Sequence, residues 1–379
     1  MNLPTATPDG IDVSILVTTY QRPGHLSLAL ESLAAQRAPG CNLEVIVSDD
    51  GSADQTADVV AAFAARAPFP VRFTTQPHDG FRAARVRNAA ARLARGRYLL
   101  FLDGDCVAPP HHVAAHLDRR RPGTALLGFF ARLTPEASTT LAATGPAAAD
   151  LAAVMPRSER RALRRRWLRA RWHAALRHPT KPRLVSGDFG VWRSDFTLVN
   201  GFDERFVGWG HEDDDFGLRL RAAGVRLESI LDRTASLHLW HPPDPTAGPR
   251  WRDGVNMAYF ARRGRLTACR AGLRRRPAAS LTWGLPDDCA ATPLGRAVAA
   301  LLADAPLAPP GAACEIDVAV RPGTGGFRRP AECRLALVAT DPRLPDAVPD
   351  AEFVRRADRI ERVAPADLAG LARILDEAG

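Results

Sequence analysis

The first hundred residues alternate between short aliphatic runs and longer segments in which apolar residues recur every three or four positions. The short runs predict buried strands at residues 11–20, 43–48, 71–74 and 98–102. The segments between them predict helices at about residues 25–36, 53–66 and 85–94. Strands that alternate with helices favour an α/β fold with a doubly wound, mostly parallel twisted sheet flanked by helices.

Polar residues gather at the carboxyl ends of these predicted strands, where open parallel sheets bind their ligands. They are Tyr20, Asp49, Asp50, Asp103 and Asp105. The last strand runs directly into Asp103-Gly104-Asp105. Two carboxylates on either side of a glycine suit a hard divalent cation such as Mg2+ or Mn2+ that carries phosphates.

Four consecutive acidic residues, Glu212 to Asp215, follow a Gly-Trp-Gly turn at residues 208–210. A helical segment begins directly after them, near Phe216. Adjacent carboxylates repel one another, so something cationic or a helix end must compensate them. A helix N-terminus offers that compensation, and it can keep a carboxylate ionised as a general base.

The pattern changes near residue 262, and the Pro/Ala-rich stretch that follows through Pro310 reads as a linker or irregular subdomain. Beyond it we expect strands at residues 315–320 and 334–338, and a closing helix at about 365–377 with Pro365 in its first turn. We therefore divide the chain into residues 1–262 and 263–379. The second part contains no recognisable catalytic or ligand-binding motif. We expect it to form a small α/β appendage that supports the first domain or binds a partner.

Composition is that of a soluble globular protein, with 46% hydrophobic and 25% charged residues. No apolar run approaches the roughly 20 residues that span a bilayer, and residues 1–10 lack the pattern of a signal peptide. The six cysteines are scattered without a C-x-x-C pair, which favours reduced, mostly structural thiols. These features predict a cytoplasmic protein.

The formal charge of +9 is concentrated in residues 157–183. Within residues 157–177, Leu163, Trp167, Leu168, Trp172 and Leu176 recur at near-helical spacing among arginines, which predicts a basic amphipathic helix inserted in the first domain. Two alternatives stay open: a solvated helix that lies on the domain, or contact with anionic lipid on the inner membrane face or with a lipid-linked acceptor. No helix-turn-helix or zinc pattern accompanies the charge, so we expect no nucleic-acid partner.

Five motifs, taken in order, resemble those of family 2 glycosyltransferases of the GT-A fold. They are Thr18-Thr19-Tyr20, Asp49-Asp50-Gly51-Ser52, Arg87-Asn88, Asp103-Gly104-Asp105, and the segment from Val199 through Trp209-Gly210-His211-Glu212-Asp213. The last segment looks like the galactosyltransferase-type half of chondroitin-polymerising and polypeptide N-acetylgalactosaminyl enzymes. The resemblance covers roughly residues 11–260 and implies an inverting, metal-dependent hexosyltransferase that uses a nucleotide sugar.

The resemblance implies that the first half of the sheet binds the nucleotide sugar. The residues concerned are Thr18, Tyr20, Asp49, Asp50, Arg87, Asn88, Asp103 and Gly187. Thr18, Tyr20 and Asp50 would hold the uridine, whereas Asp49 has capping of the next turn as an equal alternative. Gly187 would belong to a wall of the sugar pocket, Ser186 to Gly190, in which Asp188 stands where the family usually shows an amide.

The same resemblance assigns the metal and the chemistry. Asp105 would bind Mn2+ or Mg2+ directly, together with His238 and His241. Asp213 would be the general base that deprotonates the acceptor hydroxyl, and Glu212 would orient the acceptor or take the base's place. Trp209 and Gly210 would bind the acceptor sugar, with an ordinary core role as the alternative for Trp209.

The implied reaction moves a sugar from a UDP-sugar donor to a hydroxyl of a glycan or lipid-linked glycan, in surface polysaccharide or lipopolysaccharide synthesis. A nucleotidyltransferase would share the α/β layout, but it would need a Gly-rich phosphate loop with a lysine, and residues 18–23 do not form one. An inactive binding module would be expected to lose Asp105, Asp213 or the histidines, and none is missing.

Overall fold

The computed structural model describes residues 10–243, 247–285, 291–309, 311–321, 327, 330–340 and 351–378. Within it the chain forms two compact units, Met1–Met257 and Ala258–Gly379. The division falls close to residue 262, where the composition changes. Residues 1–9, Cys289 and Pro310 lie outside the described residues.

The first unit is built on a seven-stranded sheet with the order β3-β2-β1-β4-β8-β6-β9. The strands are β1 (Val13–Thr19), β2 (Leu43–Asp49), β3 (Val71–Thr75), β4 (Tyr98–Asp103), β6 (Thr124–Leu127), β8 (Asp188–Trp192) and β9 (Arg226–Ser229). All neighbours run parallel except β8, which is antiparallel to both β4 and β6. The predicted mostly parallel sheet is confirmed.

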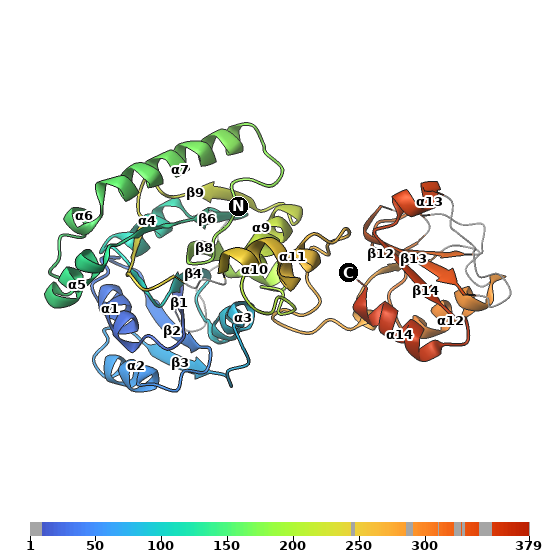
Figure 1. The fold of residues 1–379 in the computed structure, drawn as a ribbon, viewed down its shortest axis with the longest axis horizontal. Coiled ribbons are helices and arrows are strands. Elements are labelled where there is room, and N and C mark those ends of the chain that lie inside the picture. The colour runs from blue at the N-terminus through green and yellow to red at the C-terminus, as the bar shows by residue number, and fades with distance from the viewer. Residues whose placement is uncertain are drawn as a thin grey trace. The chain divides into compact units, whose positions relative to one another are not determined.

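Helices flank this sheet (Figure 1); all but the last two lie between its strands in the chain, and the last one, Val255–Phe260, runs across the division between the two units. They are α1 (Pro23–Ala34), α2 (Thr56–Ala64), α3 (Ala83–Leu93), α4 (His112–Arg119), α5 (Pro135–Thr144), α6 (Leu151–Val154), α7 (Arg157–Ala175), α8 (Arg193–Leu198), α9 (Glu212–Ala222), α10 (Ala247–Asp253) and α11 (Val255–Phe260). The three early helices and the basic helix thus form where the hydrophobic spacing predicts them. In the part of the chain that the structure describes, none of these helices is both long and apolar enough to cross a bilayer.

The two faces of the sheet have separate cores because side chains alternate along each strand. Val13, Ile15 and Val17 of β1 pack with the buried leucines of α1 on one face. On the other face Phe101 of β4 stacks on Phe189 of β8, with ring centroids 4.4 Å apart. Phe196, Phe202 and Phe216 continue this aromatic layer under α8 and α9. The sheet is therefore buried on both sides, as parallel sheets require.

A small second sheet crosses the carboxyl end of β4. It contains β5 (Cys106–Val107), β10 (Ser236–His238) and β7 (Phe130–Arg132), in that order. His238 pairs with Cys106 on one side and with Arg132 on the other. This sheet, which the sequence pattern did not predict, brings the chain near residue 238 beside the Asp103-Gly104-Asp105 loop.

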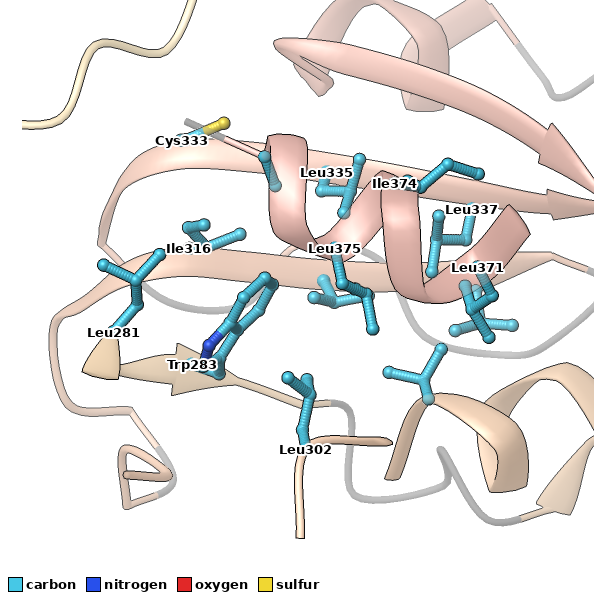
Figure 2. Packing of buried hydrophobic residues seen from close by; sticks show 14 of the residues in the cluster. Leu281, Trp283, Leu302, Ile316, Cys333, Leu335, Leu337, Leu371, Ile374 and Leu375 are labelled. Carbon is cyan, nitrogen blue, oxygen red and sulfur yellow. The ribbon is translucent and has the colours of Figure 1, made fainter. Parts of the chain in front are cut away.

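The second unit contains a four-stranded parallel sheet with the order β11-β12-β13-β14. Its elements are the 3-10 turn Ala278–Ser280, β11 (Trp283–Gly284), α12 (Pro293–Leu301), β12 (Cys314–Arg321), β13 (Ala331–Ala339), α13 (Ala351–Arg356), β14 (Arg359–Val363) and α14 (Leu368–Glu377). Figure 2 shows the indole of Trp283 among Leu281, Leu302, Ile316 and Leu375.

Two expectations about the second unit need correction. The Pro/Ala-rich stretch does not form a linker, because Leu281, Trp283, Leu294 and Val298 are buried in the core of this unit. Pro365 does not lie in the first turn of the closing helix. The helix begins at Leu368, and the Asp367 side chain caps it by accepting a hydrogen bond from the Gly370 N–H at 2.8 Å. A capping carboxylate defines this start better than the proline does.

Candidate active site

The loop between β4 and β5 is held against the end of β1. The Gly104 N–H donates to the Thr18 carbonyl at 2.7 Å, and a Cβ at residue 104 would lie only 2.9 Å from that oxygen. Any larger residue would push the loop away from β1. The glycine of the Asp103-Gly104-Asp105 motif therefore fixes where the two carboxylates stand.

Asp105 lies beside both predicted histidines. Its Oδ1 is 3.6 Å from His238 Nε2, and its Oδ2 is 3.5 Å from His241 Nε2. One ligand atom from each of these three residues lies within 4.8 Å of the other two. The Leu239 N–H donates to the Asp105 carbonyl at 2.9 Å and locks the two segments together. The small second sheet thus gathers residues that are far apart in the sequence.

The environment keeps Asp105 ionised. Burial alone would raise its pKa, but the hydrogen bond from His241 and the charges of His238 and Arg22 lower the pKa to about 2. One ionised carboxylate and two imidazoles form a mixed oxygen and nitrogen ligand set. Mg2+ prefers oxygen ligands only, whereas Mn2+ accepts carboxylate and lies closer to the metals that imidazole suits. The residues therefore fit a divalent ion, and they fit Mn2+ better than Mg2+.

Arg22 is a site residue that the sequence analysis missed. Its Nη1 lies 2.9 Å from Asp105 Oδ2, and 40% of its side chain is exposed. It stands at the start of the connection from β1 to α1, two residues after Tyr20, so its place next to the strand-end cluster was a usable signal. It brings a permanent positive charge to the rim of the metal-ligand group.

The carboxyl ends of β1 and β2 form a neighbouring polar subsite. Asp50 accepts from Gln76 Nε2 at 2.6 Å and from the Arg82 N–H at 3.0 Å. Tyr20 stacks on His78, with ring centroids 4.4 Å apart and planes 12° from parallel. The structure brings Tyr20 and Asp50 to the same edge of the sheet, and it adds Gln76 and His78 as neighbours that the sequence analysis did not single out.

Asp49 organises its own loop. It accepts hydrogen bonds from the N–H groups of Gly51 and Ser52, from the Ser52 hydroxyl and from the Thr75 hydroxyl, at 2.6 to 3.1 Å. The side chain is 2% exposed. All these partners are within the protein, so the contacts agree with the capping alternative, and a contact of Asp49 with a nucleotide stays a prediction.

Asp103 is connected to the acidic helix start through Arg87. The Thr18 hydroxyl donates to Asp103 Oδ1 at 2.9 Å, and Arg87 Nη2 lies 3.3 Å from the same oxygen. Arg87 Nη1 reaches Glu212 Oε1 at 3.1 Å. Arg87 is 5% exposed, so one buried guanidinium joins the strand-end loop to the first residue of α9.

Asn88 has a different task from its neighbour. Its amide group accepts from the Phe202 N–H at 2.9 Å and donates to the Phe202 carbonyl at 2.8 Å and to Glu204 at 2.9 Å. The side chain is fully buried. These contacts hold the loop before the Gly-Trp-Gly turn in place. A direct contact of Asn88 with a nucleotide stays a prediction.

The four acidic residues of α9 differ in their cationic partners. Glu212 pairs with Arg87 at 3.1 Å, Asp214 with Arg183 at 3.5 Å, and Asp215 with the fully buried Arg219 at 2.7 Å. Within the described part of the chain Asp213 makes no ion pair. Among the described residues, three of the carboxylates are therefore paired with arginines and Asp213 is not.

The surroundings of Asp213 raise its pKa far above that of an ordinary aspartate. Burial first, and then the charges of Glu212 and Asp214, raise its pKa to about 8, although Arg87 opposes the shift. At neutral pH this carboxyl is therefore mostly protonated, which contradicts the expectation that the helix start keeps it ionised; its ionised form is far more basic than that of an ordinary aspartate. Asp213 Oδ1 accepts the Asp214 N–H at 2.8 Å, which fixes its orientation at the helix start.

The Gly-Trp-Gly turn before α9 has backbone angles that glycine adopts easily. Gly208 has φ +83° and Gly210 has φ +106°. Asn256 of α11 holds the turn, because its amide donates to the Gly210 carbonyl at 3.0 Å and accepts the Val207 N–H at 3.2 Å. Trp209 is 36% exposed. The ring is thus available at the surface, unlike an ordinary core tryptophan.

Gly187 and Asp188 face opposite sides of the sheet. A Cβ on Gly187 would lie 2.8 Å from Asp103 Oδ2, so Gly187 borders Asp103, and a contact of Gly187 with the sugar stays a prediction. Asp188 pairs with Leu102 in the sheet, and its carboxylate points to the other face, toward His112 and His116 of α4. The Asp188 side chain is therefore not part of a sugar-pocket wall next to Asp103, because successive strand residues point in opposite directions.

Two family models match the chain. Residues 14–144 match the model described as glycosyl transferase family 2, and residues 172–241 match the model described as the N-terminal domain of galactosyltransferase. Together they contain every candidate site residue of the first unit that the sequence analysis named.

Curated relatives match the first unit. Validoxylamine A glucosyltransferase of Streptomyces hygroscopicus subsp. limoneus is 33% identical over 244 residues, which are 59% of this chain and 51% of the relative. Chondroitin synthase of Escherichia coli is 26% identical over 245 residues, covering 59% of this chain and 34% of the relative. The chain spans about half the length of the two Streptomyces relatives that it matches.

Solved structures with a similar fold are more distant. A mannosyltransferase from Pyrobaculum calidifontis in complex with GDP-Man and Mn2+ is 19% identical, with a TM-score of 0.44, covering 66% of this chain and 63% of that one. TarS 1-349 of S. aureus in complex with UDP is also 19% identical, with a TM-score of 0.42 and 61% coverage of each chain.

Proposed function

Because the chain carries a glycosyltransferase family 2 domain at residues 14–144, we propose that it transfers a sugar from a UDP-sugar to a hydroxyl of a glycan acceptor, with inversion at the anomeric carbon. The proposal combines a metal-assisted departure of the nucleotide with deprotonation of the acceptor by a carboxylate. We take the acceptor to be a glycan or lipid-linked glycan of a surface polysaccharide or lipopolysaccharide. The names of the relatives support sugar transfer, and they leave the donor and acceptor of this chain as part of the proposal.

The observation that carries the proposal is the bridge made by Arg87. This buried guanidinium contacts Asp103, at the end of β4, and Glu212, at the start of α9. The end of β4 and the start of α9 are therefore neighbours, which supports a single site in which the first would bind the nucleotide and the second the acceptor. An inverting displacement needs this arrangement, because the acceptor oxygen must attack from the face opposite to the departing nucleotide while a base stands on the side of attack.

On the donor side, Tyr20 and Asp50 would bind the base of the nucleotide, the tyrosine by stacking and the carboxylate by accepting from the uracil imide. Thr18 and Arg87 fix Asp103, which would orient the ribose or the phosphates. Asp105, His238 and His241 would hold Mn2+. When bound there, the ion would neutralise the charge that develops on the diphosphate. Arg22 stands beside Asp105 and would add a second positive charge for the same phosphates.

On the acceptor side, Asp213 would take the proton of the attacking hydroxyl. The other carboxylates of α9 are paired with arginines, and the raised pKa of Asp213, about 8, makes its ionised form a stronger base than an ordinary aspartate, so that transfer should increase as the pH rises through this value. Glu212 is bound to Arg87 and would orient the acceptor. Trp209, exposed on the adjacent turn, would offer its indole face to the C–H bonds of the acceptor sugar, and Gly210 would leave room for it. A cytoplasmic enzyme that acts at the inner membrane face would fit this acceptor.

Titration calorimetry with UDP, with and without Mn2+, tests the donor half. We expect UDP to bind much more tightly when Mn2+ is present, and Asp105→Ala to remove that gain because the ion loses its charged ligand. Asp118→Ala, on the exposed end of α4, removes a carboxylate remote from the ligand group and should behave as wild type. Equal UDP affinity in EDTA and in Mn2+, or an unchanged Asp105→Ala protein, would contradict the metal bridge.

The donor itself can be found without knowing the acceptor. Hydrolysis of a panel of UDP- and GDP-sugars in Mn2+, measured as released nucleotide, should single out one UDP-sugar. Preference for a GDP-sugar would overturn the choice of uridine and leave the metal assignment in place. Hydrolysis of none of the sugars by a protein that binds UDP would argue against the transferase proposal.

A further inference from the structure

We propose that His112, His116 and Asp188 form a second, buried metal site that binds Zn2+ and is separate from Asp105, His238 and His241. His112 and His116 lie one turn apart on α4, so both face the sheet. Asp188 begins β8 and points toward them. This inference does not depend on the proposed function.

The three side chains converge on one point. Asp188 Oδ1 lies 3.3 Å from His112 Nε2 and 3.8 Å from His116 Nε2. One ligand atom of each residue lies within 4.8 Å of the other two. A tetrahedral ion with bonds of about 2.0–2.1 Å holds its ligand atoms about 3.3 Å apart. The spacing already approaches that of a filled site, and small side-chain movements would complete it.

These atoms also lack other partners. His112, His116 and Asp188 are each 1% exposed. Among the residues that the structure describes, His112 Nε2, His116 Nε2 and Asp188 Oδ1 accept or donate no hydrogen bond of normal geometry. Buried nitrogen and oxygen atoms nearly always have a partner, because losing water without replacement is costly. Within the described chain, Asp188 Oδ1 has only the two histidine nitrogens, at 3.3 and 3.8 Å, as neighbours of this kind, and an ion between the three atoms would satisfy all of them.

The opposite atom of each ligand is held by a neighbour. His112 Nδ1 lies 2.8 Å from Thr234 Oγ1, and His116 Nδ1 lies 3.4 Å from the Tyr98 hydroxyl. Ser236 Oγ donates to Asp188 Oδ2 at 2.9 Å. Partners of this kind fix the tautomer and orientation of metal ligands. Here they leave one nitrogen or oxygen of each residue free and aimed inward.

The chemistry of the ligand set identifies the ion. Two imidazoles and one carboxylate are a common zinc combination, and zinc takes four ligands in a tetrahedron. The described residues supply three, so a water molecule would complete the shell. The site would tie α4 to the sheet at β8, whose neighbour Gly187 borders Asp103. Its role would be structural support of the donor side of the candidate active site.

The test measures zinc in a protein whose surface ligand group has been removed. The His238→Ala/His241→Ala chain is purified after growth with zinc, treated briefly with EDTA and then unfolded in the presence of a zinc-sensitive dye. We expect release of roughly one zinc per chain, because a buried ion resists brief chelation. Asp188→Asn in the same background should release little zinc, whereas His111→Gln, an exposed neighbour on the same helix start, should release as much as the parent.

A second measurement covers the case in which Asp188→Asn does not fold. The His238→Ala/His241→Ala chain is refolded with Co2+, and its visible spectrum should show the strong absorption of four-coordinate cobalt. Thr234→Val, which removes the partner of His112, should weaken zinc binding by about 10- to 100-fold. A parent chain that releases no zinc, or one whose zinc content and cobalt spectrum are unchanged in Asp188→Asn, would overturn the proposal and leave a histidine–aspartate ion pair.

Discussion

At the scale of single residues, Asp213 is the side chain on which the proposed chemistry depends most. Asp213→Asn keeps the shape of the side chain and removes the base. We expect transfer to fall by about a hundred- to ten-thousand-fold, the usual contribution of a general base. UDP affinity in Mn2+ should stay near that of wild type, because the residue lies at the start of α9, in the half that we assign to the acceptor.

Glu212→Gln is the matched comparison for this experiment. Glu212 is neutralised by Arg87 at 3.1 Å, so its loss should raise the KM for the acceptor more than it lowers kcat. If Asp213→Asn stays active while Glu212→Gln is dead, the base is Glu212. A product with retained anomeric configuration would refute the single displacement.

The same residue makes a prediction about stability and pH. The pKa of Asp213 is raised from 3.8 to about 8 in the folded protein, first by burial and then by its acidic neighbours. The folded state therefore holds this proton more firmly than the unfolded state does. Its stabilising contribution is complete below the ordinary pKa and is lost as the pH rises through the folded value.

Asp213→Asn has no proton to lose at this position. In thermal unfolding without metal or nucleotide, we expect its Tm to exceed that of wild type at about pH 8.5 and the difference to shrink toward about pH 4.5. Asp118→Asn, an exposed carboxylate on α4, should show no such trend. A difference in Tm that is constant across this range would contradict the raised pKa.

At the scale of elements, α7 has a face that its own domain leaves uncovered. Leu163 and Ala170 are buried, but Leu168, Trp172 and Leu176 are 42%, 68% and 70% exposed. Arg161 and Arg165 lie on the same stripe, three or four positions apart along the helix. Exposed apolar side chains flanked by arginines favour a helix that lies on an anionic membrane surface.

Sedimentation with vesicles tests this prediction. The protein should bind vesicles containing anionic lipid at low salt, and binding should weaken as salt screens the arginines. Trp172→Ser with Leu176→Ser should reduce binding, whereas Leu198→Ser, also well exposed but on α8, should not. Arg166 is unsuitable for replacement, because its guanidinium lies 3.6 Å from the centre of the Phe129 ring. Binding that ignores both lipid charge and salt would favour a merely solvated helix.

At the scale of the whole molecule, the second unit has its own core and should unfold on its own account. Trp283→Ala deletes the largest buried side chain of that core and should cost about 3–5 kcal/mol. Calorimetry of this variant should show two unfolding transitions, of which only one has a lowered Tm. UDP with Mn2+ should raise the Tm of the other transition, because we expect these ligands to bind the first unit. Leu301→Ala, an exposed apolar site on α12, is the control. If the protein shows a single unfolding transition, and both Trp283→Ala and the addition of UDP with Mn2+ shift its Tm, the two units unfold as one.

Local sequence pattern by itself determined the strands and helices of the first hundred residues and their order, together with the basic helix and the helix that carries Phe216. Aliphatic runs such as Val13 to Val17 can be buried on both faces only as inner strands, so their composition alone predicts the parallel sheet. The strand-end residues Asp50, Asp103 and Asp105 followed from the same pattern, because parallel strands end at one edge of their sheet. Boundaries and caps, such as Asp367 in place of Pro365, were less certain because they depend on single hydrogen bonds.

Only the tertiary structure decided which side chains meet. His238 reaches Asp105 through the small second sheet, and no periodicity in the sequence encodes a pairing between segments so far apart. Arg87 pairs with both Asp103 and Glu212, and Asp214 and Asp215 each pair with another arginine. In the described structure Asp213 is therefore left without an ion pair. The register of β8 places the Asp188 side chain on the face of the sheet opposite to Gly187, where it lies near His112 and His116. The charge partners and the burial of a side chain depend on residues that are distant in the sequence and close in the fold. The contacts of these residues could therefore be known only from the tertiary structure.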